Sequence, residues 1–344
     1  MGQRVLTKVQ YGLEGTHGTA VAADTRLMAW CTMPESDREV IIPGAGIGQR
    51  VPGLLSAAYV RRVLAEGIRL ETPGESGAYY QIFPLLFSLA IKGSISPSEQ
   101  NSGEGDYLWT FADPLTGSET VDTMTLEMGD GTGANEGYEM AYCAISELEI
   151  AGNADSGEVT ANATLFGDEV ARTQLTDVGT MPTATAVIGK LARVYVDDTW
   201  AGLGSNELEN ALLDFTLSVG TGVHPKLRGS SQRTIDSHDQ GEMEVTLTLG
   251  LERGASGVAT EEAYYRATTV TSRFVRLEID SGIAIGSGDN HKLTLDIAGA
   301  WMSWHSLGRD QDGNNIAVAT LRAGYDSTGT HAFTFKALTD VASI

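Results

Sequence analysis

The chain has 344 residues, a length typical of two domains of about 150 to 180 residues each. Its formal net charge of −22 argues against binding nucleic acid through a basic surface, because such binding needs Lys and Arg to displace counterions. Cys31 and Cys143 lack CxxC spacing, so we expect two buried thiols. The longest apolar stretch, 83–91, is too short to span a membrane, and the N-terminus has no signal-like apolar segment. We therefore expect a soluble protein made in a cytoplasm.

Alternation of apolar and polar residues, the pattern of a half-buried strand, dominates the chain, and 41 glycines supply turns. Two segments have helical spacing instead, 78–92 and 261–269, the second opening with acidic residues that suit a helix N-terminus. The clearest strand candidates ahead of the second helix are 213–219 and 243–249. Four strands are predicted after each helix: 107–111, 121–128, 142–150 and 158–167, then 273–280, 291–299, 315–323 and 331–338. The sequence thus predicts a mainly β protein.

The matching order of elements indicates an internal duplication. Two seven-residue loops, 151–157 and 323–329, both start Ala-Gly and end in Gly, and each is expected to join a pair of strands in a hairpin. A run of small residues at 176–186 is typical of a linker. We predict one domain at 1–180 and a second at 181–344.

Motifs for catalysis or metal binding are weak in this sequence. The glycines at 44–48 depart from GxGxxG spacing and lie outside any βαβ unit, so a loop is expected. The acidic run at 310–314 resembles the start of a calcium loop, but Leu321 occupies the twelfth position, where the bidentate Glu is expected. His238, Asp239 and Glu242 have no further ligand at metal-site spacing. We predict no catalytic residues, no metal, no cofactor and no enzymatic activity.

Three segments together resemble one known family. The stretch 11–20, YGLEGTHGTA, resembles the G-x-E-x-x-x-G-T opening of tail tube proteins of long-tailed (siphovirus-like) bacteriophages. The segment 144–167 is similar to the family's strand, polar turn and strand ending in Gly, and 191–198 followed by 210–219 and 242–250 makes a third match. These segments are spread over most of the chain.

The resemblance implies a major tail tube protein. The fold would be two tandem tail-tube-like β-sandwich domains, each with one flanking α-helix, whose sheets join those of neighbouring subunits in a β-barrel ring. Six domains per ring then need three chains, a pseudo-hexameric trimer, whereas a single tube domain with a decoration domain would need six chains. The implied partners are further copies of the chain, a tape-measure protein, and tail terminator and tail-tip proteins. The protein would be assembled in the host cytoplasm and reside in the virion tail, with DNA passing through the lumen and no membrane involved.

The resemblance also implies an N-terminal arm that contacts the next ring, and its matched residues are Tyr11, Gly12, Glu14, Gly18 and Thr19. The second half lacks a clear copy of this motif, so how the halves share stacking contacts is an open point.

Two long stretches, 44–64 and 220–241, are expected to be irregular loops ahead of each helix, and loops of that length usually serve a contact. They concentrate basic residues that would complement carboxylates on an adjacent ring. These contact candidates are Arg50, Arg61, Arg62, Lys226, Arg228 and Arg233. Ordinary solvated loops are the alternative interpretation. Part of the acidic excess is expected to line the lumen, where like charge would keep DNA from adhering.

Two functions of other classes remain open. A secreted carbohydrate-binding or adhesin β-module would be a monomer with an exposed aromatic cluster, and a hydrolase on a β scaffold would need a clustered acid pair that the sequence does not display.

Overall fold

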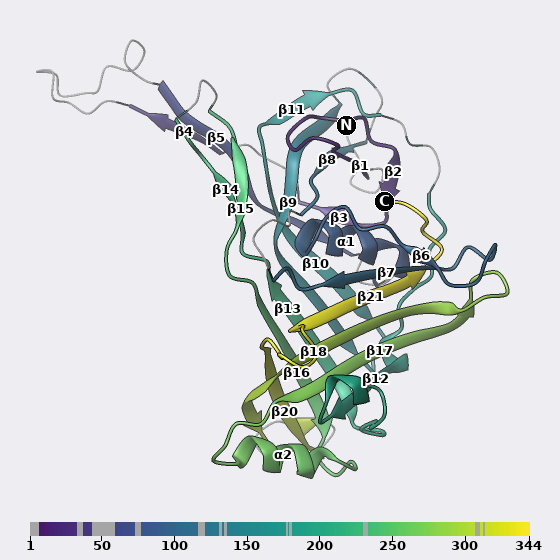
Figure 1. Cartoon of the computed structure of the whole chain (residues 1–344). Helices are drawn as coiled ribbons and strands as arrows, with labels where there is room; N and C mark the ends of the chain where they lie inside the picture. Colours follow the sequence, from purple (N-terminus) through teal and green to yellow (C-terminus); the bar gives the residue numbers. More distant parts are fainter. Residues whose placement is uncertain are drawn as a thin grey trace, which may run out of the picture.

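The computed structural model describes residues 7–32, 37–42, 59–72, 77–115, 121–130, 133, 136–176, 178, 181–229, 233–306, 310–311 and 314–344. Strands hold 54% of the chain and helices 9%, which confirms the prediction of a mainly β fold (Figure 1). The strands are β1 (Lys8–Leu13), β2 (Thr25–Leu27), β3 (Trp30–Cys31), β4 (Asp37–Ile41), β5 (Tyr59–Glu71), β6 (Ser98–Glu99), β7 (Tyr107–Ala112), β8 (Met124–Gly129), β9 (Gly137–Asn153), β10 (Val159–Gly167), β11 (Val170–Thr173), β12 (Ala192–Asp197), β13 (Leu212–Gly220), β14 (Val223–Lys226), β15 (Ser237–Gln240), β16 (Glu244–Glu252), β17 (Arg273–Ala284), β18 (Asn290–His305), β19 (Asp310–Gln311), β20 (Asn314–Ala323) and β21 (Phe333–Thr339). The helices are η2 (Tyr80–Ile82), α1 (Phe83–Ala90), η3 (Gly189–Leu191), η4 (Trp200–Gly202) and α2 (Val258–Arg266).

A continuous antiparallel sheet runs through the molecule. Its strands follow one another in the order β5, β10, β9, β13, β16, β20 and β18. Apolar side chains alternate with polar ones along these strands, so one face packs on the core and the other is polar. The described strands do not close into a barrel within one chain.

The two halves of the chain repeat one pattern of strand pairing. In the first half β1 pairs with β8, β8 with β9, β9 with both β10 and β11, and β10 with β5. In the second half β12 pairs with β17, β17 with β18, β18 with both β20 and β21, and β20 with β16. Helix α1 follows β5, and α2 follows β16, so the chain order also agrees. The division into domains 1–180 and 181–344 stays a prediction.

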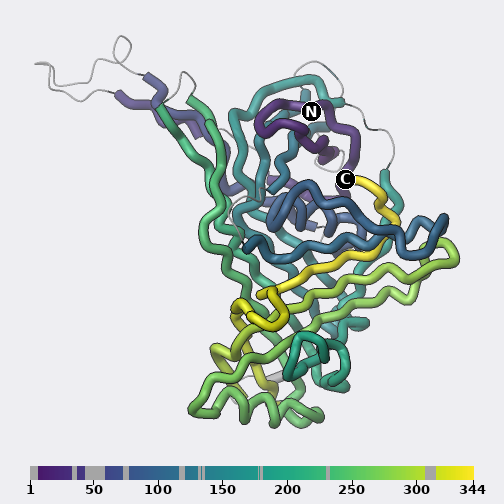
Figure 2. The backbone as a smooth tube through the Cα atoms, viewed as in Figure 1, coloured from purple at the N-terminus to yellow at the C-terminus, as the bar shows by residue number. Residues whose placement is uncertain are grey.

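The halves also contact each other through distant segments. Strand β7 pairs with β21, so the blue and yellow segments run side by side in Figure 2. Trp109 donates from Nε1 to the carbonyl oxygen of Val341 at 2.8 Å, and the hydroxyl of Tyr80 donates to the Ile279 carbonyl at 3.2 Å. One large cluster of buried apolar residues therefore includes members of both halves.

Three sequence-based predictions need correction. Helix α2 begins at Val258 rather than 261, because Gly257 takes a left-handed φ of 87° at its N-cap. The stretches 44–64 and 220–241 are irregular only in part, since residues 59–64 belong to β5 and β14 pairs with β15. The loop 151–157 does join the paired strands β9 and β10, whereas 323–329 joins β20 and β21, which pair with other strands.

Candidate assembly surface

The joint between the two halves is a strand pair. Strand β13 pairs with β9 from Asp214 opposite Asn153 to Gly220 opposite Glu147. Gly152 is required there, because a Cβ at this position would lie 2.4 Å from the ring of Phe215. The sheet of the first half thus continues into that of the second through a fitted, hydrogen-bonded seam.

The counterpart of this seam in the second half has no partner within the described chain. Residues 300–305 of β18 pair on one side with β20, and no described strand pairs with their other edge. In the repeated pattern β9 and β18 are equivalent, so this open edge corresponds to the edge of β9 that β13 occupies. At the other end of the sheet, β3 and β4 pair with β5.

The side chains at the open edge of β18 suit a contact. Met302 is 57% exposed, although it lies beside two buried indoles, Trp301 and Trp304, whose rings meet edge to face at 5.3 Å. The buried Nε1 of Trp304 has no hydrogen-bond acceptor in the described part of the chain. A buried indole N–H usually finds a hydrogen-bond partner, and this one has none among the described residues.

The polar face of the sheet is acidic. Across β5, β10, β9, β13 and β16 it forms a shallow hollow of about 390 Å³. Four carboxylates and one guanidinium line it: Glu71, Glu147, Glu149, Glu244 and Arg69. Arg322 on β20 pairs with Glu244 at 3.3 Å and partly offsets the charge.

Two hairpins project from the body beside each other (Figure 1). We call them the arms: β4 with residues 59–64 of β5, and β14 with β15. The Val63 N–H donates to the Arg233 carbonyl at 2.9 Å and ties the arms together.

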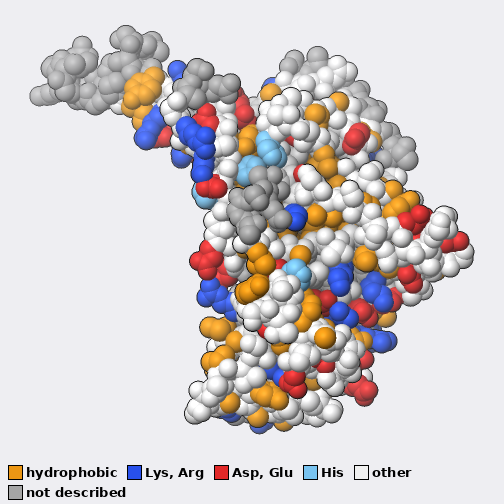
Figure 3. Space-filling view, viewed as in Figure 1, with side chains coloured by type: hydrophobic (Ala, Val, Ile, Leu, Met, Phe, Trp, Pro, Cys, Tyr) orange, Lys and Arg blue, Asp and Glu red, His pale blue; other side chains and the backbone are white. Residues whose placement is uncertain are grey.

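Several predicted basic residues meet on these arms, and Figure 3 shows blue side chains along them. Arg61, Arg62, Arg228 and Arg233 border one hollow of about 390 Å³. Glu39 pairs with Arg61 at 3.1 Å and with Arg62 at 3.2 Å, both at exposed positions where an ion pair contributes little stability.

The two other basic candidates stand apart from that hollow. Lys226 lies on β14 and pairs with Asp239. Arg50 lies outside the described residues, as do the glycines at 44–48.

The residues of the N-terminal motif lie within the folded body. Glu14 is buried and accepts four hydrogen bonds, from the hydroxyls of Thr123 (2.6 Å) and Thr125 (3.0 Å) and from the backbone N–H groups of Gly18 (2.7 Å) and Tyr142 (2.8 Å). These bonds hold the motif against β8 and the bulged part of β9.

The motif's other residues differ in their surroundings. Gly18 has a φ of 74°, and a Cβ there would lie 2.6 Å from the Tyr142 ring, while a Cβ at Gly12 would lie 2.6 Å from the Ala22 carbonyl oxygen. Tyr11 is buried, and Thr19 is exposed. Packing and hydrogen bonding within this chain therefore account for the glycines and the glutamate of the motif. No pattern in the sequence indicated which residues on and next to β8 and β9 would bind Glu14.

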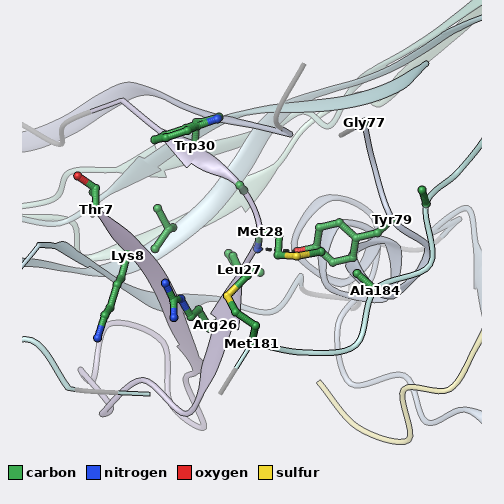
Figure 4. Close-up of a pocket in the computed structure, with 13 residues that line it drawn as sticks. Thr7, Lys8, Arg26, Leu27, Met28, Trp30, Gly77, Tyr79, Met181 and Ala184 are labelled. Atoms are coloured by element: carbon green, nitrogen blue, oxygen red, sulfur yellow. Dashed lines mark hydrogen bonds between the residues drawn. The ribbon is translucent and has the colours of Figure 1, made fainter. Parts of the chain in front are cut away.

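A separate pocket of about 410 Å³ lies between β1, β2 and residues 181–186 (Figure 4). Its lining is largely apolar and includes Met28, Trp30, Tyr79 and Met181. The Tyr79 hydroxyl accepts the Met28 N–H at 3.0 Å, and burial raises the pKa of Tyr79 to about 12. The phenol of Tyr79 therefore stays protonated at neutral pH and does not supply a phenolate nucleophile there.

The described residues include two free cysteines, the buried Cys143 and the half-buried Cys31. Burial raises the pKa of Cys31 to about 12 and that of Cys143 well above its usual value, so both thiols stay protonated at neutral pH. Within these ranges no three His, Cys, Asp or Glu side chains are grouped to hold a metal ion.

No model of a known protein family matches the chain, and no curated protein matches it. In the part of the chain that the structure describes, no helix has the length and apolar character to cross a membrane.

Proposed function

We propose that this chain is the structural subunit of a phage tail tube, and that it assembles into stacked rings around a lumen. The observation that carries the proposal is the repeated seam: β13 occupies the edge of β9 inside the chain, while the equivalent edge of β18 is open. An edge strand from another copy would complete it in the same way.

The repetition defines a ring. If an edge strand of the next copy pairs with residues 300–305 of β18, each seam between chains copies the seam within a chain. Such head-to-tail contacts form a closed ring when a whole number of units completes one full turn. Two tube-like sandwich domains per chain, each with one flanking helix, make a six-unit barrel from three chains.

In this ring the polar face of the sheet lines the lumen, because the apolar face packs against the protein core. Its carboxylates would repel DNA phosphates within a Debye length of about 8 Å, so DNA could pass without binding. The arms project from the body and are placed to contact the next ring, with the N-terminal motif supporting the strands behind them. A tape-measure protein and terminator and tip proteins would be the other partners, in a virion tail.

The first experiment is negative-stain electron microscopy of the purified chain with a mass measurement of its soluble oligomer. We expect hollow tubes with three chains per ring. Six chains per ring would keep the function and contradict the duplicated ring. A monomer that never polymerises, even when seeded, would contradict the proposal and favour a carbohydrate-binding module, which binding to a glycan array would test.

A matched pair of variants tests the seam itself. Met302→Lys places a charge at the open edge, and we expect the critical concentration for assembly to rise at least tenfold. Val270→Lys is the control, since Val270 is 79% exposed on the connection after α2. Both monomers should fold normally, because exposed substitutions change stability by about 0.5 kcal/mol or less. Equal critical concentrations for the two variants would contradict a role of the β18 edge in assembly.

A further inference from the structure

The root of the arms is held by a small apolar cluster of its own, separate from the main core. Its buried members come from the arms and from the strands beneath them: Leu64, Val121, Tyr142, Ala144, Phe166, Val223 and Ile235. A satellite cluster of this size can open without unfolding the main sheet, because local stability follows the apolar contacts that a segment makes.

Two imidazoles lie at the edge of this cluster, and Figure 3 shows pale blue side chains where the arms meet the body. The ring centres of His17 and His238 are 5.0 Å apart at an interplanar angle of 85°. Nδ1 of His238 is 3.1 Å from the Tyr142 hydroxyl. Its Nε2 is buried and has no hydrogen-bond partner in the described part of the chain. When Nδ1 of neutral His238 carries the hydrogen and donates to the Tyr142 hydroxyl, Nε2 is bare, whereas the protonated ring carries an N–H at both nitrogens.

In the described arrangement no acceptor lies within hydrogen-bond distance of this Nε2, although several charged groups are near His238. On its own strand Asp239 pairs with Lys226. Glu14, on the far side of Tyr142, already accepts four hydrogen bonds. Asp168 is hydrogen-bonded to the arm at Ile235 and Thr234, burial raises the pKa of its carboxyl, and its buried Oδ1 has no partner among the described residues, His238 included. Protonated His238 would therefore hold a buried N–H without an acceptor, beside a second imidazole that repels it when also charged.

We propose that the root of the arms is a pH-sensitive joint, in which neutral His238 holds β14–β15 to the body and its protonation releases them. The geometry of the two imidazoles and the satellite cluster carries this inference. Its consequence for ring stacking rests on the proposed function, because the arms are the candidate contacts between rings.

The direction of the pH dependence follows from the burial. Burial lowers the pKa of His238, with His17 adding to the effect. A group whose pKa is lower in the folded state stabilises that state above its unfolded pKa, about 6.5 for His. The stabilisation is lost as the pH falls from about 6.5 toward the folded pKa, so the arms should be docked at pH 7.5 and loosened in mild acid.

Hydrogen–deuterium exchange of the full chain tests the joint directly. Between pH 7.5 and 5.0 we expect protection of 223–226 and 237–240 to fall at least tenfold, relative to unstructured peptide at the same pH, while β17 stays protected. His238→Gln should remove this pH dependence. His224→Gln is the matched control, since His224 is exposed on the same hairpin, with its Nδ1 3.0 Å from the Gly222 carbonyl oxygen and Asp239 opposite it on β15; it should behave as wild type.

Two outcomes overturn the inference: pH-independent protection in the wild type, or an unchanged loss of protection in His238→Gln. If that variant misfolds, NMR titration of ¹³C-labelled His238 in the wild type decides instead, and a midpoint at or above 6.5 contradicts the proposal. Tube formation at pH 7.5 is scored separately, so a chain that never polymerises but still shows the exchange switch contradicts only the proposed function.

Discussion

Helices α1 and α2 occupy the same place in the repeated strand pattern, yet their surroundings are opposite. All eight residues of α1 are buried. In α2 only Val258 and Glu261 are buried. Equivalent positions in a repeated fold can therefore hold a core helix in one half and a surface helix in the other.

The difference arises from what covers each helix. Strands β7 and β21 pair across α1, and the rings of Phe111 and Phe335 lie 5.6 and 5.5 Å from that of Phe87. Helix α2 is instead held by polar contacts: Glu261 accepts two bonds from Arg273, at 2.9 and 2.6 Å, and one from Trp301 at 3.1 Å. Apolar packing fixes one helix, and a buried ion pair fixes the other.

Truncating the centre of the α1 contact should have the largest effect. Phe87→Ala removes a fully buried ring from three aromatic neighbours, and we expect a loss of about 3–5 kcal/mol in the free energy of unfolding. Urea denaturation followed by circular dichroism measures it. Tyr265→Ala, at a 36% exposed position of α2, is the control and should cost less than about 1 kcal/mol. Equal losses would mean that the helices are not packed differently.

Breaking the buried ion pair should come next. Glu261→Ala leaves the Arg273 guanidinium buried with Asp198 and the ring of Tyr264 as its remaining neighbours, at a cost of about 3 kcal/mol. The comparison variant is Glu262→Ala, whose carboxylate binds the exposed Arg266 and Ser306 and should matter by about 1 kcal/mol or less. Thermal unfolding of both variants separates the cases, and a neutral Glu261→Ala would show that apolar contacts alone hold α2.

The smallest effect belongs to the exposed face of α2. Arg266 and Glu262 pair at i, i+4 with an N–O distance of 2.6 Å, and Arg266→Ala should cost about 0.3–0.5 kcal/mol. The loss should shrink further in 1 M salt, because exposed pairs are screened. A loss above about 2 kcal/mol would indicate that α2 is more tightly integrated than its exposure suggests.

The sequence predicted the elements better than their pairing. The α1 segment and the strands at 107–111 and 158–167 agree closely with β7 and β10, because apolar patterning is local. Strand β9 begins at Gly137 rather than 142, since a bulge that places Tyr142 at a φ of 58° interrupts the alternation. The contact of β7 with β21 depends on the whole fold and leaves no local pattern.

The site shows the same limit. Sequence reasoning identified basic residues in two stretches, and the structure brings Arg61, Arg62, Arg228 and Arg233 together. It did not identify the seam of β9 and β13, because a register is set by pairing rather than by either strand alone. The open edge of β18 is recognised only by comparison with that seam.

The pairing of β7 with β21 also has a consequence for synthesis on the ribosome. Trp109 and its acceptor carbonyl at Val341 are 232 residues apart along the chain. At about 5–20 residues per second, roughly 12 to 46 s pass between the translation of these two residues. During that interval α1 lacks the cover of β21, so the nascent chain exposes apolar surface that is prone to aggregation. An incomplete chain would therefore self-associate through the exposed apolar side chains of α1. In the complete chain these side chains are covered, and the open edge of β18 is left for contacts with other copies.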